Sequence, residues 1–173
     1  IKKLVYDEKA YSLDQYVKML DADFVGFEKE RRRILNLPKY GNDHDEADQM
    51  FLKVHDHVCN YTRDQRKNTN LHSYLVVIIN NDTHVYMGEN TAASPDGRRA
   101  GEYMANGNSP MDGADKNGVT AFLNSIAKPD PSIHAGAVQN MKFSKELFTK
   151  HRDKIEILLE TYFEQGGAQA MIT

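Results

Sequence analysis

The residues best suited to chemistry lie in one long polar stretch, residues 89–124. Residues 95–97, Pro-Asp-Gly, form a turn sequence, because proline presets φ at the first corner while Asp and Gly tolerate the conformations that complete a turn. Arg98 and Arg99 follow directly, and their forked donors can hold carboxylates or backbone carbonyl oxygens. A segment of this length without regular structure is usually functional or disordered. The stretch is therefore the first candidate for a functional site, in which we expect Arg98 to act as a structural clamp.

A second tight turn, Asp115-Lys116-Asn117-Gly118, precedes a predicted helix at 119–127. The first amides of a helix point outward, and the helix dipole favours negative charge near them. The turn could therefore hold either an anion or a neighbouring carbonyl oxygen.

Two groups of potential metal ligands fail on spacing. His55 and Cys59 are four residues apart on a predicted helix, with His57 between them, but a zinc site needs three or four ligands and no closing pair follows. Residues 42–46 offer consecutive oxygen ligands, whereas a calcium loop alternates them. We predict no metal site in this chain.

Other catalytic patterns are also absent from the sequence. The glycines at 88, 97 and 101 fit neither a dinucleotide-binding nor a phosphate-loop pattern. Ser94 and His84 could belong to a nucleophilic triad, but nothing in the sequence pairs them.

The bulk composition excludes several classes of partner. The chain has 173 residues, a net charge of -3 and a single cysteine, Cys59. Nucleic acid and anionic membranes require a clustered basic face; the one basic run, 29–33, reads as a solvated helix face. No apolar stretch is long enough to cross a bilayer. We expect a cytoplasmic protein that binds neither nucleic acid nor membrane.

Apolar periodicity predicts an α/β fold in one domain, residues 1–173. The helix at 44–66 has an inward face marked by residues that recur at helical spacing: Ala47, Met50, Phe51, Val54, Val58 and Tyr61. The apolar run 74–79 predicts a strand buried on both faces, in a sheet covered by helices on both sides. The remaining expected elements are helices at 13–35, 119–127 and 145–164 and strands at 84–87, 135–143 and 168–173. Helices that alternate with strands favour parallel pairing.

Several short motifs occur in an order that resembles one enzyme family. They are Pro38-Lys39-Tyr40-Gly41-Asn42-Asp43, Pro95-Asp96-Gly97-Arg98, Arg99-Ala100-Gly101, Asn108-x-Pro110-Met111, Gly113-x-Asp115, Ala121-x-Leu123-x-Ser125-x-Ala127-Lys128, Asn140-Met141-Lys142-Phe143 and Gly166-Gly167. Each motif alone is weak, but their common order is similar to that of the glycyl radical enzymes, the family of pyruvate formate-lyase and its dehydratase and decarboxylase relatives.

The resemblance implies a fold and a chemistry. The fold would be a fragment of a ten-stranded α/β barrel, with helices packed around part of a mostly parallel half-barrel sheet, and the parent would usually be a homodimer. A radical SAM activating enzyme installs a radical on a backbone glycine, which passes it to a cysteine that takes a hydrogen atom from a small organic substrate. Such enzymes break a C–C or C–heteroatom bond under anaerobic conditions, and both reacting groups must lie close together.

The resemblance transfers no catalytic residue to this chain. The family's radical glycine lies in an R-V-x-G-(F/Y) motif beyond the Gly-Gly strand, and Cys59 falls on a helix after the PKYGN turn rather than in the upstream cysteine loop. We expect a C-terminal portion of the barrel that ends before the glycine loop, binds no cofactor or metal itself and is inactive in isolation. The residues expected to line the substrate pocket or support the glycine loop are Asn90, Thr91, Ser94, Asp96, Arg98 and Gln139.

The resemblance leaves the reaction open. Gly166-Gly167 is followed by Ala168-Gln169-Ala170-Met171, where pyruvate formate-lyase more often has GGQHLNV, so formate acetyltransferase activity is one option beside a dehydratase, a decarboxylase or another lyase. An alternative is a non-catalytic split or degenerate scaffold that pairs with another chain through its final strand. A third is an anion or small-molecule binder that uses the arginines and turn amides of 89–124.

Overall fold

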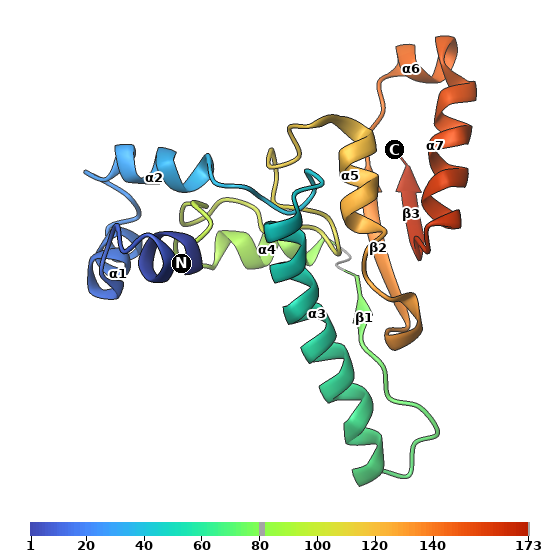
Figure 1. Cartoon of the computed structure of the whole chain (residues 1–173), viewed down its shortest axis with the longest axis horizontal. Coiled ribbons are helices and arrows are strands. Elements are labelled where there is room, and N and C mark those ends of the chain that lie inside the picture. Colours follow the sequence, from blue (N-terminus) through green and yellow to red (C-terminus); the bar gives the residue numbers. More distant parts are fainter. Residues whose placement is uncertain (80–81, 173) are drawn as a thin grey trace. The chain divides into compact units, whose positions relative to one another are not determined.

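The computed structural model describes residues 1–79 and 82–172, which form two compact units (Figure 1). The first unit comprises residues 1–37 and 82–104, and the second comprises the described residues of 38–81 and 105–173. Asn80 and Asn81, and Thr173, the last residue of the predicted final strand, lie outside the described residues. The single domain expected from the sequence remains a prediction.

The first unit consists of short helices around a small core. Its elements are η1 (Lys2–Asp7), α1 (Leu13–Asp21), α2 (Glu28–Leu35) and α4 (Thr83–Glu89). The start of α1 is a capping box, in which the Ser12 hydroxyl accepts from the Gln15 amide and the Gln15 side chain accepts from the Ser12 amide. The buried core residues are Leu4, Tyr16, Met19, Phe24 and Ile34.

The predicted helix at 13–35 is wrong in one respect, because it breaks into α1 and α2. Asp23, Phe24 and Gly26 between the two helices have φ values of 48°, 59° and 80°. Such left-handed conformations end a right-handed helix. Phe24 nevertheless fits the apolar spacing, since the turn itself places its ring in the core.

The predicted strand at 84–87 is wrong, because these residues lie in helix α4. Asp82 precedes the helix with φ of 60°. Gly88 is buried on α4, and a Cβ added there would lie 2.5 Å from the Glu102 carbonyl oxygen. Four residues are too few for their spacing to distinguish a strand from a helix. Here the close packing of residues 102–104 against Gly88 accompanies the helix.

The second unit contains a parallel three-stranded sheet in the order β1 (Val77–Ile78), β2 (Gly136–Met141), β3 (Gln169–Ile172). Val77 pairs with Gly136, and Val138 to Met141 pair with Gln169 to Ile172. Helices lie between the strands in sequence, so the predicted α/β class with parallel pairing is confirmed. The predicted helices at 44–66 and 119–127 appear as α3 (Asp45–Gln65) and α5 (Gly118–Ile126). Two short 3₁₀ turns, η2 (Arg66–Asn68) and η3 (Pro131–Ile133), complete the connections.

The predicted helix at 145–164 is divided into α6 (Lys145–Lys150) and α7 (Arg152–Glu164). His151 between them has φ of -139° and ψ of 35°, outside the helical region. The Ser144 hydroxyl caps α6 by accepting from the Leu147 amide, as its position predicts. The core of this unit joins α5, α7 and the strands through buried Phe122, Leu123, Ile126, Ala127, Met141 and Tyr162.

The first strand is shorter and more exposed than predicted. Among the described residues of the predicted strand 74–79, Val77 and Ile78 pair with β2, and Val77 is 52% exposed, so the expected burial on both faces is wrong for this strand. Beyond this pair the 107–109 segment takes the position beside β2. The Asn108 amide donates to the Val138 carbonyl, and the Asn140 amide donates to the Ser109 hydroxyl.

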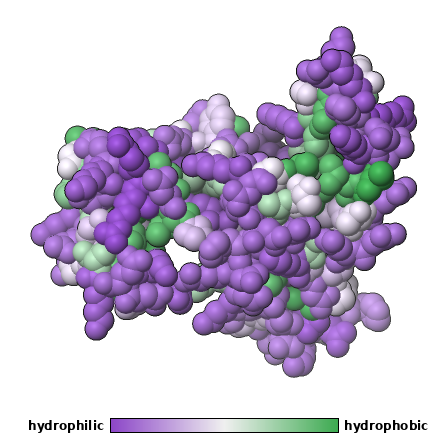
Figure 2. All heavy atoms as spheres, turned by 45° about the horizontal axis from the view of Figure 1, so that its top comes forward, coloured by the Kyte–Doolittle hydropathy of each residue, from purple (hydrophilic) through white to green (hydrophobic). Residues whose placement is uncertain are grey.

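Hydrophilic residues cover most of the face shown in Figure 2, with separate areas of apolar residues among them. Several large apolar side chains are exposed, including four on α3. Among the described residues, no helix has the length and apolar character needed to cross a membrane.

Candidate functional site

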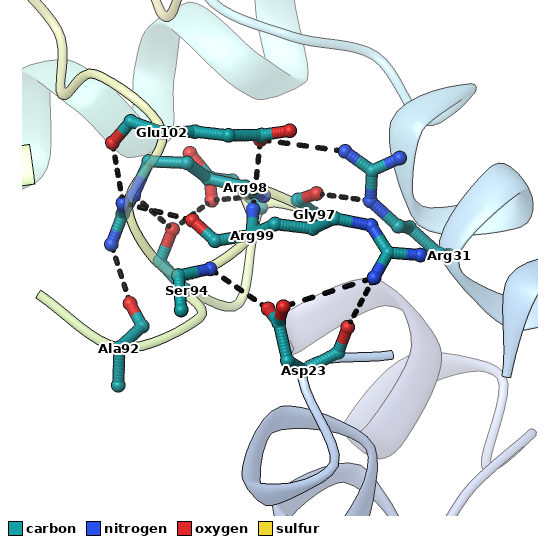
Figure 3. A network of polar contacts seen from close by, with 10 residues as sticks. Asp23, Arg31, Ala92, Ser94, Gly97, Arg98, Arg99 and Glu102 are labelled. Atoms are coloured by element: carbon teal, nitrogen blue, oxygen red, sulfur yellow. Dashed lines mark hydrogen bonds and ion pairs between the residues drawn. The ribbon is translucent and has the colours of Figure 1, made fainter. Parts of the chain in front are cut away.

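The side chain of Arg98 is buried inside the loop at 91–102 of the first unit (Figure 3). Its acceptors are all atoms of this loop: the carbonyl oxygens of Glu102 (2.7 Å), Arg99 (3.0 Å), Ala92 (2.5 Å) and Thr91 (3.4 Å) and the hydroxyl of Ser94 (3.2 Å). Each guanidinium nitrogen therefore has a partner, and the expected structural clamp is confirmed. No donor of Arg98 remains for an anion, which weakens the anion-binder alternative.

The Pro-Asp-Gly turn forms as predicted and is tied to the clamp. The Ser94 hydroxyl donates to the Asp96 carboxylate at 2.5 Å, and the same carboxylate oxygen accepts from the Arg98 amide at 3.3 Å. The Ser94 amide donates to the Arg98 carbonyl at 3.0 Å. Ser94, Asp96 and Arg98 thus form one network.

Two further arginines fasten this loop to helix α2 and to the turn between α1 and α2. Arg31 on α2 donates through Nε to the Gly97 carbonyl at 2.8 Å. Arg99 donates to the Asp23 carbonyl at 2.7 Å, while the Asp23 carboxylate accepts from the Ala100 amide at 2.8 Å. The left-handed turn that breaks the predicted first helix is therefore an anchor for the loop (Figure 3).

A buried tyrosine of α1 binds the backbone of the Pro-Asp-Gly turn. The Tyr16 hydroxyl on α1 donates to the Pro95 carbonyl at 2.7 Å. Burial, with a smaller effect of the Asp96 charge, raises the pKa of Tyr16 to about 12. The hydroxyl therefore remains a donor throughout the neutral range.

The other two predicted residues of this unit bind the end of α4. The Asn90 side chain donates to the Tyr86 carbonyl at 2.8 Å, and the Thr91 hydroxyl donates to the Met87 carbonyl. Thr91 also joins the clamp through its backbone, whereas Asn90 is exposed and takes no part in it.

Gln139 lies in the second unit and is buried on β2. Its Oε1 accepts from the Tyr162 hydroxyl at 2.8 Å, and this hydroxyl also lies 3.2 Å from the Gln169 carbonyl of β3. Burial raises the pKa of Tyr162. The Tyr162 ring covers Gly167, where an added Cβ would lie 2.3 Å from the ring. Tyr162 therefore links helix α7 to the two longer strands, with Gln139 as its partner on β2.

Asn42 joins two motifs that the sequence places far apart. Its Oδ1 accepts from the amides of Lys116 and Asn117 at 2.8 and 3.1 Å, and its Nδ2 donates to the Ala114 carbonyl at 2.7 Å. The sequence left open whether the amides of the Asp115–Gly118 turn hold an anion or a carbonyl oxygen. In the structure they bind a carbonyl oxygen, the side-chain Oδ1 of Asn42. Gly41 packs against Pro110, so the PKYGN and NSPM segments also touch.

Sequence reasoning missed a buried ionic network beside Asn42. Asp48 on α3 is fully buried, and its Oδ2 accepts from Lys128 at 2.5 Å and from the Ser125 hydroxyl at 3.0 Å. Lys128 also pairs with Asp43 at 3.0 Å. Burial opposes the charged Lys128, but the two carboxylates outweigh it and raise its pKa. The sequence signal that could have pointed to this network is that Asp43 and Lys128 both belong to the motifs that carry the family resemblance.

A cavity of about 260 Å³ opens at the carboxyl end of β2. Asp115, Asn140 and Lys142 supply its polar lining, and Phe122 and Phe143 supply apolar walls. The carboxyl ends of parallel strands are frequent ligand sites in α/β proteins. Asp115 and Gly118 of the turn that binds Asn42 line this cavity, so hydrogen bonds to Asn42 hold one side of it in place.

Cys59 and His55 do contact each other on α3, with Sγ 3.6 Å from Nε2, and His55 Nδ1 lies 2.9 Å from the Asp56 carboxylate. The thiol is buried, and burial raises its pKa, which disfavours the reactive thiolate. Across residues 1–79 and 82–172, no group of three or more His, Cys, Asp or Glu side chains is placed to hold a metal.

Two family models match the chain in succession. The model described as pyruvate formate lyase-like covers residues 1–88, and the glycine radical model covers residues 104–173. Trans-4-hydroxy-L-proline dehydratase of Clostridioides difficile is 35% identical over 174 residues, which cover 96% of this chain and 21% of that enzyme. Isethionate sulfite-lyase of Bilophila wadsworthia is 35% identical over 130 residues, which cover 71% of this chain and 15% of that enzyme.

Solved structures give the same result for the fold. The glycerol-bound, B12-independent glycerol dehydratase from Clostridium butyricum matches with a TM-score of 0.89 and 32% identity, over 99% of this chain and 22% of that one. The hydroxyproline dehydratase of Clostridioides difficile with its substrate bound matches with a TM-score of 0.89 and 30% identity, over 100% and 22%. The chain thus spans about a fifth of the length of these relatives. The expected barrel-fragment fold is confirmed, and the chain belongs to the pyruvate formate lyase-like family of glycyl radical enzymes.

Proposed function

We propose that the whole protein is a glycyl radical lyase that breaks a carbon–heteroatom bond of a small polar substrate, and that residues 1–173 form a C-terminal portion of its barrel. One observation carries the proposal: nearly the entire chain aligns with a dehydratase in sequence and with dehydratases in structure. A sulfite-lyase among the relatives also supports removal of a heteroatom group rather than cleavage between carbons.

The reacting groups belong outside residues 1–173 in this proposal. When present, a backbone glycyl radical supplies hydrogen-atom abstraction by way of a cysteine. The residues of this chain do not fit either role, because Cys59 is buried with a raised pKa and the sequence holds no R-V-x-G-(F/Y) motif. This chain instead supplies supporting residues.

The supporting residues in this proposal are the six predicted from the sequence: Asn90, Thr91, Ser94, Asp96 and Arg98 in the first unit and Gln139 in the second. We assign them to support of the substrate pocket or the glycine loop rather than to contact with the reacting atoms. The engagement of Arg98 with backbone carbonyls and of Gln139 with Tyr162 supports this role. A radical SAM activating enzyme, a homodimer and a cytoplasmic location are proposed from the family resemblance.

Acyl transfer of the pyruvate formate-lyase type is the second candidate. The match to the pyruvate formate lyase-like model favours it, whereas Ala168 to Met171 after Gly166-Gly167 departs from that enzyme's usual sequence.

The test is anaerobic activation of the full-length protein with its activating enzyme, followed by electron paramagnetic resonance. We expect a glycine-centred doublet, and product formation from trans-4-hydroxy-L-proline, a 1,2-diol or isethionate. Formate and acetyl-CoA from pyruvate and coenzyme A would support acyl transfer instead. If glycerol dehydratase treated in parallel gives the doublet and this protein does not, the radical proposal fails and the scaffold alternative gains support.

A further inference from the structure

Helix α3 presents apolar side chains on two different faces. Its buried face carries Asp48, His55 and Cys59, each at most 6% exposed. Another face carries Met50, Val54, Val58 and Tyr61, which are 40%, 58%, 46% and 62% exposed. Their spacing of four, four and three residues places them in one row along the helix. We name these four residues the α3 stripe.

The α3 stripe corrects the sequence-based expectation for this helix. The apolar periodicity predicts that these four residues face inward. In the structure no described residue covers them, whereas Asp48 and His55 of the same helix are buried. Scattered apolar side chains on a surface are ordinary, but a contiguous row bordered by polar residues marks a contact surface. Exposed Gln49 and Lys53 border the row on one side.

The shape and charge of the α3 stripe fit an apolar helical partner. The row spans 11 residue steps, or about 16 Å at the helical rise of 1.5 Å per residue. Apolar side chains at three- and four-residue spacing are the pattern by which one helix packs along another. Both charge signs occur beside the row, in Lys53 and Asp64, so neither a strongly acidic nor a strongly basic partner is selected.

The extent of the α3 stripe argues for a partner within the same polypeptide. A stable interface between separate molecules buries roughly 800 Å² per partner and involves about 20–30 residues on each side. Four side chains on one helix fall far short of that. A tethered segment binds at high effective concentration and needs no such area. The relatives are about five times as long as this chain, so a large part of the polypeptide is available to provide the segment.

We propose that the α3 stripe packs against an apolar helix of the same polypeptide outside residues 1–173. The inference rests on the proposed function, in which residues 1–173 are part of a longer enzyme. A contact with a second copy or with an unrelated protein is an outcome of the test below and would overturn it.

The test introduces a photoactivatable phenylalanine derivative at position 54 of the full-length protein, with the same residue at position 49 as the matched control. Mass spectrometry of an equal mixture of ¹⁴N- and ¹⁵N-labelled protein distinguishes crosslinks within a chain from those between chains. We expect position 54 to crosslink several-fold more than position 49, within one chain and to a peptide outside 1–173. Crosslinks that join the two labels, or yields equal at both positions, would overturn the proposal.

A second measurement covers the case in which the probe perturbs the fold. V54D/V58D should lower the Tm of the full-length protein by several degrees more than Q49D, which adds acidic charge to the exposed polar side of α3. Equal Tm values would overturn the proposal. The radical doublet, recorded on the wild-type preparation, separates the two ideas: crosslinks without a doublet reject the radical function alone, and a doublet without crosslinks rejects the packing alone.

Discussion

The Arg98 guanidinium donates to the Glu102 carbonyl at 2.7 Å from inside the loop that both residues belong to. A buried charge is tolerated only when its donors are all satisfied, and here four loop carbonyls and the Ser94 hydroxyl satisfy them. The cation therefore determines the loop conformation without any ligand. A loop whose conformation is fixed without a ligand can support a pocket whose reacting groups lie on other segments.

The first prediction concerns Arg98→Lys. Lysine keeps the charge, but one ammonium group cannot reach carbonyl oxygens on both sides of the loop. The orphaned carbonyls should lower the free energy of unfolding by about 2–4 kcal/mol, measured by urea denaturation. R99K is the matched control, because Arg99 is partly exposed and its loss should cost less than about 1 kcal/mol. Equal midpoints for the two variants would contradict the clamp.

The elements that the sequence predicted correctly are those whose periodicity is long and whose ends are marked. Helix α3 and strand β2 are of this kind. The errors occur where the backbone leaves the helical conformation although the apolar pattern continues. Phe24 has a left-handed conformation but keeps the helical spacing of apolar residues. His151 separates α6 from α7 although it is neither proline nor glycine. Apolar spacing alone therefore does not show whether the backbone between the spaced residues is helical.

The candidate site shows the same limit. Ser94, Asp96 and Arg98 are close in sequence, so turn chemistry could relate them. The Asp48–Lys128 pair joins residues 80 positions apart, and local reasoning has no access to such a pair. The exposed α3 stripe is a further case, since apolar periodicity predicts burial but does not say which segment provides it.

The second prediction compares Gly167→Ala with Gly166→Ala. At position 167 the new Cβ would lie 2.3 Å from the fully buried Tyr162 ring, which has no space to move. Overpacking should cost about 1–3 kcal/mol or more and should weaken the Tyr162–Gln139 bond. At position 166 the Cβ meets no atom within 4 Å, and only the φ of 99° opposes it, at about 1–2 kcal/mol. Urea midpoints and tyrosine near-UV circular dichroism would test this order; a larger loss for G166A would contradict it.

The third prediction concerns the pair of Lys128 and Asp48. K128M leaves the fully buried Asp48 carboxylate with Ser125 as its remaining hydrogen-bond partner on Oδ2. Removal of one member of a buried ion pair should cost about 3–5 kcal/mol. D48N/K128M should recover part of that loss, which a double-mutant cycle measures. The control is K116M, because the Lys116 side chain is exposed and its amide, not its ammonium, binds Asn42. Additive losses in the cycle would show that the two charges do not interact.

The last prediction is an acid-dependent loss of stability at His134. Burial, followed by the neighbouring His55 ring from α3, lowers the pKa of His134 below its ordinary 6.5, against the opposing charge of Asp130. The rings of His55 and His134 meet edge to face at 5.4 Å, and Arg63 acts on Asp130 from the end of α3.

The sign of the effect follows from proton binding. Below pH 6.5 the unfolded chain takes up a proton on His134 before the folded chain does, so stability falls as the pH falls through this range. Asp43, whose pKa is lowered by Asn124 and Lys128, loses its contribution only below its ordinary 3.8 and so lies outside the window. H134Q should therefore show a smaller drop in Tm between pH 7.5 and 5.5 than the wild type. H57Q, on the exposed side of α3, should keep the wild-type slope. Parallel slopes for wild type and H134Q would mean that His134 takes up its proton equally in the folded and the unfolded chain, and the buried histidine pair would then have no part in acid sensitivity.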